Sequence, residues 1–104
     1  MKQMQPPSSV QGRTMKKKRI TFTFNAPEAK SVHIAGSFND WNIDSDPLSK
    51  GKDGRTSGAW RRVFYLEPGI YEYRFIVDGL WFDDPDATEL WTNEFGNFNC
   101  VIWV

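Results

Sequence analysis

Apolar residues alternate with polar ones through most of this chain, and a period of two residues is typical of a β-strand with one buried face. Ile20, Phe22 and Phe24 alternate with threonines near the start of the pattern. The stretch over 70–77 is the clearest, because Tyr, Phe and Val occupy every second position from residue 71. The pattern predicts strands over 20–24, 32–36, 60–66, 70–77, 80–83 and 98–104, and a short strand near Leu48.

Turn-forming residues separate these predicted strands. Asn25-Ala26-Pro27 and Pro68-Gly69 interrupt the alternation, and Asp78-Gly79 is a strong signal for a two-residue type I′ hairpin. Longer loops are predicted over 42–58 and over 84–96. Because no segment keeps a period of 3.6 residues, the predicted fold class is all-β, an antiparallel sandwich of immunoglobulin-like size.

The Asp78-Gly79 turn also predicts which side chains share a face. A two-residue loop pairs Ile76 with Trp81 and Arg74 with Asp83, and side chains alternate between the two faces of a strand. The core face is then predicted to carry Tyr73, Phe75, Val77, Leu80 and Phe82, and the solvent face Arg74, Ile76, Trp81 and Asp83. An exposed indole beside a guanidinium is a platform on which a sugar ring stacks while the arginine donates to its hydroxyls. The alternative is that Trp81 packs beneath the loop over 84–96.

Composition narrows the class of function. The chain has 104 residues and a net charge of +0, which fits one domain and argues against nucleic acid as a partner. Cys100 is the single cysteine, so an internal disulfide is excluded and a reducing, cytoplasmic location is expected. No apolar run approaches the ~18–20 residues of a membrane span, so no membrane association is expected. Aromatic residues make up 15% of the chain, which is enough for both a core and a stacking surface.

Residues 1–15 are polar and lack periodicity, so we expect a disordered leader followed by one module over 16–104. Met15 is an alternative to Met1 as the residue at which translation starts. The basic run over 16–19 is interpreted as a solvated entry to the first strand in preference to a nucleic-acid or membrane patch.

Four short motifs follow one another along the chain. The segment VHIAGSFNDW over 32–41 contains G-x-F-N-x-W, and LEPGIYEYRFIVDGLW over 66–81 matches L-x-P-G-x-Y-x-Y-K-F-x-V-D-G-x-W except for Arg74 at the lysine position. Asp84-Pro85 and the segment over 96–99 supply the later D-P and G-x-x-N elements. In this order, the motifs resemble carbohydrate-binding module family 48, which includes the glycogen-binding domain of the AMP-activated protein kinase β subunit and the early-set domains of isoamylases. The resemblance covers about residues 18–104 and implies an early-set immunoglobulin-like β-sandwich.

The resemblance also implies a glucan site made of Trp41, Arg74, Trp81, Phe95, Asn97 and Asn99. This chain departs from the family pattern at three of these positions: Arg74 replaces a lysine, Phe95 a leucine that pokes through a sugar ring, and Asn97 a common threonine.

Some of these residues can be interpreted without the family. Asn97 and Asn99 stand two positions apart, so their amides are expected to point the same way, toward a row of hydroxyls or into hydrogen bonds of a turn. Trp41 follows a G-S-F-N-D turn and is either a stacking residue or a loop anchor. Trp60 and Trp103 are expected in the core or at its rim. Trp91 lies in a predicted loop and is expected either to pack against the core or to be a stacking residue.

An enzyme is not expected. Asp83, Asp84 and Asp86 could be taken for paired catalytic carboxylates, but Asp84-Pro85 is typical of the start of a turn, so they are interpreted as turn formers. His33 has no Cys or acidic partner at motif spacing, and Pro47 interrupts a segment that resembles the start of a calcium loop, so no metal or cofactor is expected. Two hypotheses follow: a non-catalytic module that binds α-1,4-glucans (glycogen, starch, maltooligosaccharides), and a docking module of the same fold for a partner enzyme or kinase.

Overall fold

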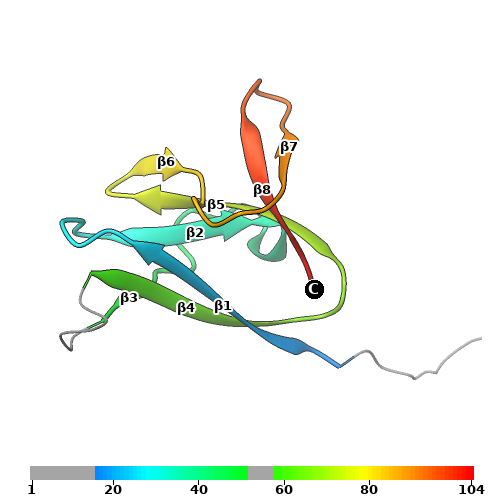
Figure 1. Ribbon diagram of the computed structural model, residues 1–104, viewed down its shortest axis with the longest axis horizontal. Helices are drawn as coiled ribbons and strands as arrows, with labels where there is room; N and C mark the ends of the chain where they lie inside the picture. Colours follow the sequence, from blue (N-terminus) through cyan, green and yellow to red (C-terminus); the bar gives the residue numbers. More distant parts are fainter. Residues whose placement is uncertain (1–15, 52–57) are drawn as a thin grey trace, which may run out of the picture.

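The computed structural model describes residues 16–51 and 58–104, and the predicted leader over 1–15 lies outside the described residues. Strands dominate the described ranges (Figure 1). They are β1 (Lys18–Asn25), β2 (Val32–Gly36), β3 (Ser49–Lys50), β4 (Ala59–Leu66), β5 (Ile70–Val77), β6 (Leu80–Phe82), β7 (Leu90–Thr92) and β8 (Phe98–Trp103). A short 3₁₀ helix, η1 (Ser37–Asn39), follows β2. Within the described ranges, no helix is long and apolar enough to cross a membrane.

The strands form two antiparallel sheets. One has the order β1-β4-β3, and the other has the order β2-β5-β8-β7, with β6 paired to β5. Strand β5 is the spine of the larger sheet, because β2 pairs along one edge while β8 and β6 share the other. In Figure 1, β6 folds back beside one end of β5, while the β7–β8 hairpin extends away from β5 as a separate projection.

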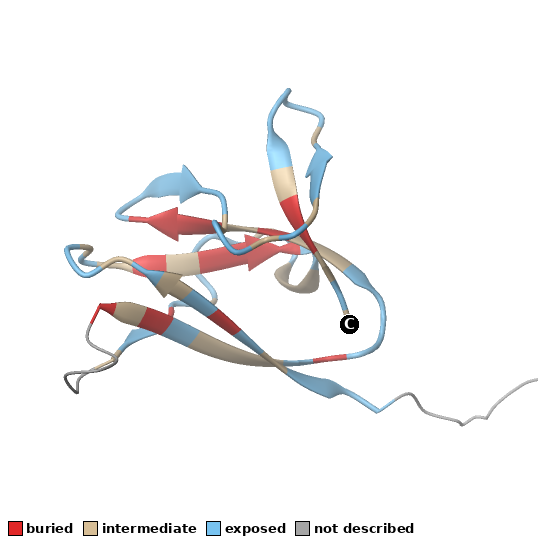
Figure 2. Cartoon of the chain, viewed as in Figure 1, coloured by how far each residue is buried: buried red, intermediate tan, exposed pale blue. Residues whose placement is uncertain are grey.

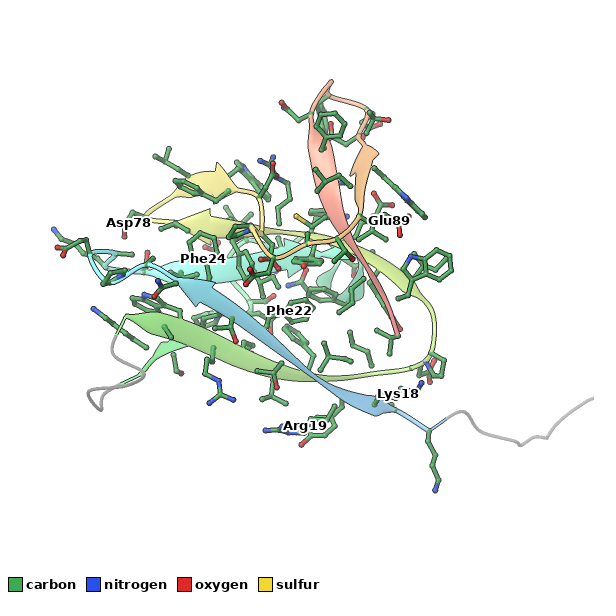
Figure 3. The ribbon with its side chains drawn as sticks, viewed as in Figure 1. Lys18, Arg19, Phe22, Phe24, Asp78 and Glu89 are labelled. Atoms are coloured by element: carbon green, nitrogen blue, oxygen red, sulfur yellow. The ribbon has the colours of Figure 1, made fainter. Side chains whose placement is uncertain are left out.

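The core lies where the two sheets face each other. Phe22 of β1 contacts Tyr73 of β5, with ring centroids 4.8 Å apart, and Phe24 contacts Phe75 at the same distance. Figure 3 labels Phe22 and Phe24 between the sheets, and Figure 2 shows buried residues along the facing strands. These contacts confirm the predicted all-β sandwich, while its immunoglobulin-like character stays a prediction.

The predicted hairpin register is confirmed, because Ile76 pairs with Trp81 and Val77 with Leu80. Asp78 and Gly79 have φ angles of 49° and 84°, the positive values that a type I′ turn requires. Ile76, expected on the solvent face, is buried, with only 5% of its surface exposed. The expectation that Leu80 and Phe82 lie in the core was also wrong, since these residues are 64% and 42% exposed. The reason is that β6 pairs outside the main strand order of its sheet.

The structure also tests the expectations for the short strand near Leu48, for the loop over 84–96 and for two of the tryptophans. The short strand near Leu48 is confirmed as β3, and Trp60 is buried in the core, where its indole N–H donates to the carbonyl of Ala26 over 2.9 Å. The loop predicted over 84–96 is interrupted by β7, which pairs with β8. Trp103 is exposed rather than in the core or at its rim, because no strand within 16–51 or 58–104 covers the outer face of β8 at this position.

Candidate functional site

An open hollow of about 770 Å³ lies on the outer face of the larger sheet. Three segments that are distant in sequence contribute to it: the β5–β6 hairpin, the loop after η1, and the β7–β8 hairpin. The structure brings every residue of the predicted site to this one hollow. The lining residues are Trp41, Glu72, Arg74, Trp81, Thr92, Asn93, Glu94, Phe95, Asn97 and Asn99.

Arg74 and Trp81 form the floor of the hollow on the β5–β6 hairpin. The Nε atom of Arg74 donates to Oδ1 of Asp83 over 3.1 Å, and the guanidinium carbon lies 5.6 Å from the Trp81 ring centroid. This arrangement orients the guanidinium by an ion pair and a cation–π contact. The ion pair uses Nε, and among the described residues no hydrogen bond uses the terminal amino groups, so these can donate to a ligand. Trp81 keeps 45% of its surface exposed, and therefore offers a ring face for stacking.

Trp41 stands beside Trp81 because of the backbone path after β2. Asp40 and Trp41 both have positive φ angles, 56° and 58°, and the Trp41 N–H donates to the carbonyl of Gly36 over 2.9 Å. Gly36 separately allows β2 to pack closely against β5, since a Cβ there would lie 2.5 Å from the Glu72 carbonyl oxygen. The Trp41 and Trp81 rings lie 6.5 Å apart at 50°.

A polar network fixes the loop that carries Trp41. Asn39 donates from Nδ2 to the Ile34 carbonyl over 3.1 Å and to Oδ2 of Asp46 over 2.8 Å. Asp46 also accepts from the Ser45 hydroxyl and from Arg62 of β4, each over 2.8 Å. Burial opposes ionisation of Asp46, but the hydrogen bonds from Asn39 and Ser45, together with the charge of Arg62, outweigh it and lower the pKa of the carboxyl.

Asn93 organises the opposite wall, the turn between β7 and β8. Its Oδ1 accepts from the backbone N–H groups of Phe95 and Asn97, over 2.9 and 3.0 Å. Its Nδ2 donates to Oδ1 of Asn99 over 3.1 Å, and the Asn99 amide donates in turn to Glu72 over 3.2 Å. Phe95 stands at the tip of this turn with 80% of its surface exposed.

This network modifies the prediction for the asparagine pair. Asn97 and Asn99 both line the hollow, but the Asn99 amide already bonds Asn93 and Glu72, so it takes part in the internal hydrogen bonding that was the alternative.

Sequence reasoning did not identify Glu72, Thr92, Asn93 or Glu94. Two signals were available: Glu72 alternates with Arg74 on one face of β5, and an Asn two residues before Phe95 is typical of an Asx turn.

The aspartates after β6 have structural partners. Asp83 pairs with Arg74, while Asp84 accepts from the Tyr73 hydroxyl over 2.6 Å and from the Asp86 N–H over 2.9 Å. Burial and the hydrogen bond to Asp84 raise the pKa of Tyr73, which keeps the phenol protonated as a donor. Asp84 therefore caps a turn and accepts a partly buried hydrogen bond.

The sandwich and its open, aromatic-lined hollow define the class of a ligand-binding module. The chain belongs to the family described as the glycogen recognition site of AMP-activated protein kinase, which matches residues 18–104. Among curated proteins, it is 33% identical over 75 residues to the pig 5′-AMP-activated protein kinase subunit beta-1, covering 72% of this chain and 55% of the relative. It is 35% identical over 75 residues to the bovine subunit beta-1 and to the mouse subunit beta-2, covering 72% of this chain and 25% of each relative. The chain thus spans about half of the pig relative and a quarter of the other two.

Proposed function

We propose that this chain binds α-1,4-glucan chains, such as glycogen, starch or maltooligosaccharides, in the hollow between Trp41, Trp81 and Phe95. The observation that carries the proposal is the gathering of these aromatic side chains with Arg74 and the asparagines around one open hollow. Membership of a glycogen-recognition family supports the same ligand class.

Each group has a role that follows from its geometry. Trp41 and Trp81 stack the apolar C–H faces of glucose units, and the tilt between them follows the curvature of an α-1,4 chain. The terminal amino groups of Arg74 and the amide of Asn97 bond hydroxyls, while Asn99 is held by its neighbours and presents a fixed polar edge. Phe95 wedges against the chain from the turn. In this proposal the chain binds the glucan without breaking any bond. We also propose that it acts in the cytoplasm.

The affinity should be modest, because the hollow is open. A titration with maltoheptaose, followed by tryptophan fluorescence, should give a Kd between about 10 μM and 1 mM. A neutral ligand meets few charges, so low and high salt should give nearly the same value. A flat titration at saturating maltoheptaose would overturn the proposal.

The relatives are named as kinase subunits, which supports a second role in docking to a partner kinase or enzyme. The two roles are separable on one protein. Trp81→Ala should reduce retention on amylose resin, whereas a docking role that uses another surface would leave partner binding unchanged in that variant.

A further inference from the structure

Two tryptophans outside the hollow are held by one carboxylate. Glu89 accepts from the indole N–H of Trp91 at Oε2 over 2.6 Å and from that of Trp103 at Oε1 over 2.8 Å. We call Glu89, Trp91 and Trp103 the β7–β8 platform; Figure 3 labels Glu89 beside the base of β7. Both rings stay accessible, with 38% of Trp91 and 63% of Trp103 exposed. Two large indoles oriented by one bidentate acceptor are a prepared surface rather than side chains that move independently.

Strand register places the platform on the same face as the hollow. Trp91 pairs with Asn99, and cross-strand partners project from one side of a sheet. Trp103 lies four residues beyond Asn99 on β8, so the period of two returns it to that side. Asn99 itself lines the hollow. The face therefore continues from the site, past Asn99, to both indoles.

We propose that the β7–β8 platform is a second stacking subsite for the same glucan chain, used only by chains that extend beyond the hollow. The inference rests on the proposed function. The hollow is open, so a polymer that occupies it must leave across its rim, and the rim at Asn99 leads directly to Trp91. The platform has the composition of a sugar surface, with ring faces for stacking and a carboxylate whose oxygens accept hydrogen bonds from hydroxyls.

The test compares a ligand confined to the hollow with one that is not. β-Cyclodextrin is a closed ring that cannot continue along the face, whereas linear amylose can. In Trp91→Ala and Trp103→Ala, amylose affinity should fall by about fivefold or more, the loss of one aromatic stack, while β-cyclodextrin affinity should change by less than about twofold. Tyr65→Ala is the matched control, because Tyr65 is 60% exposed on β4 of the other sheet and should affect neither ligand.

A second measurement does not depend on the variants folding. In the unmodified chain, the indole N–H signals of Trp91 and Trp103 should shift in NMR spectra on adding amylose and stay unchanged with β-cyclodextrin. Unchanged signals with both ligands, or equal losses of both affinities in the variants, would overturn the platform. If the unmodified chain binds β-cyclodextrin and the platform variants bind amylose normally, the second subsite alone fails. If the unmodified chain binds neither glucan, the proposed function fails as well.

Discussion

At the scale of single residues, the β5–β6 hairpin separates binding from stability. Phe75 is fully buried against Phe24, whereas Trp81 projects from the other face with 45% of its surface exposed. The neighbours of Trp81 are the Trp41 ring and the Arg74 guanidinium, which both line the hollow. Truncating each side chain should therefore affect a different property of the protein.

Trp81→Ala should weaken maltoheptaose binding by about 5- to 150-fold, the loss of one aromatic stack of ~1–3 kcal/mol. Its free energy of unfolding should fall by less than about 1 kcal/mol, as for an exposed position. Phe75→Ala should lose about 3–5 kcal/mol of stability through a core cavity, while the folded fraction still binds. Urea midpoints and glucan titrations on both variants provide the measurement. The opposite pattern, with Trp81→Ala unfolded and Phe75→Ala stable, would mean that the faces are assigned the wrong way round.

At the scale of elements, the turn at Asp78 joins the β5–β6 hairpin to the segment before β2. Oδ1 of Asp78 accepts from the N–H groups of Lys30 and Ser31, over 2.8 and 3.0 Å, and the Asp78 N–H donates to the Ser31 carbonyl over 3.0 Å. Figure 3 labels Asp78 at the end of the hairpin. The side chain therefore fixes the hairpin to its neighbour while its backbone takes a positive φ.

Asp78→Ala removes the acceptor and places a residue that tolerates positive φ poorly in the turn, so the free energy of unfolding should fall by about 1–3 kcal/mol. Asp78→Asn keeps an acceptor oxygen and the tolerance of positive φ, so its loss should stay below about 1 kcal/mol. Urea denaturation of the two variants measures the difference. Equal losses would show that neither the acceptor nor the backbone angle matters to the turn.

The sequence pattern predicted those strands and turns well whose position is determined by neighbouring residues in the chain. The Asp78-Gly79 dipeptide sets its own turn, and the register of the hairpin follows from it. The three-residue strand β7 has no alternation of its own and exists because β8 pairs with it, so no local signal could reveal it. Likewise, the exposure of Phe82 and Trp103 depends on which strands the opposite sheet covers. The alternation of apolar and polar residues shows which side chains share a face, but it does not show whether another sheet covers that face.

At the scale of the whole molecule, Asp46 connects the smaller sheet to the loop that carries Trp41. Arg62 of β4 donates to Asp46 from one side, and Asn39 donates to it from the other. The gathering of the site residues depends on such long-range contacts. The family resemblance identified residues around the hollow, but the supporting Asn93 and Asp46 networks become visible only when strands distant in sequence are brought together.

The lowered pKa of Asp46 makes part of this connection depend on pH. A carboxyl whose pKa is lower in the folded than in the unfolded chain stabilises the fold above about pH 4, and this contribution is lost as pH falls through the folded pKa. The unfolding free energies of the parent chain and of Asp46→Asn should therefore differ by a constant amount above about pH 5 and converge below about pH 4. Urea titrations at a series of pH values check this. A difference that stays constant into acid would contradict the role assigned to the ionised carboxylate.

The most direct test of the glucan site follows the indole N–H signals in NMR spectra during a titration with β-cyclodextrin. The signals of Trp41 and Trp81 should shift together, because both rings line the hollow. Trp60 provides an internal control, since it is 8% exposed in the core and its indole N–H bonds the Ala26 carbonyl, so its signal should stay in place. Shifts of Trp41 and Trp81 that saturate with one Kd are the predicted result. Unmoved signals from both residues at saturating β-cyclodextrin would contradict the site.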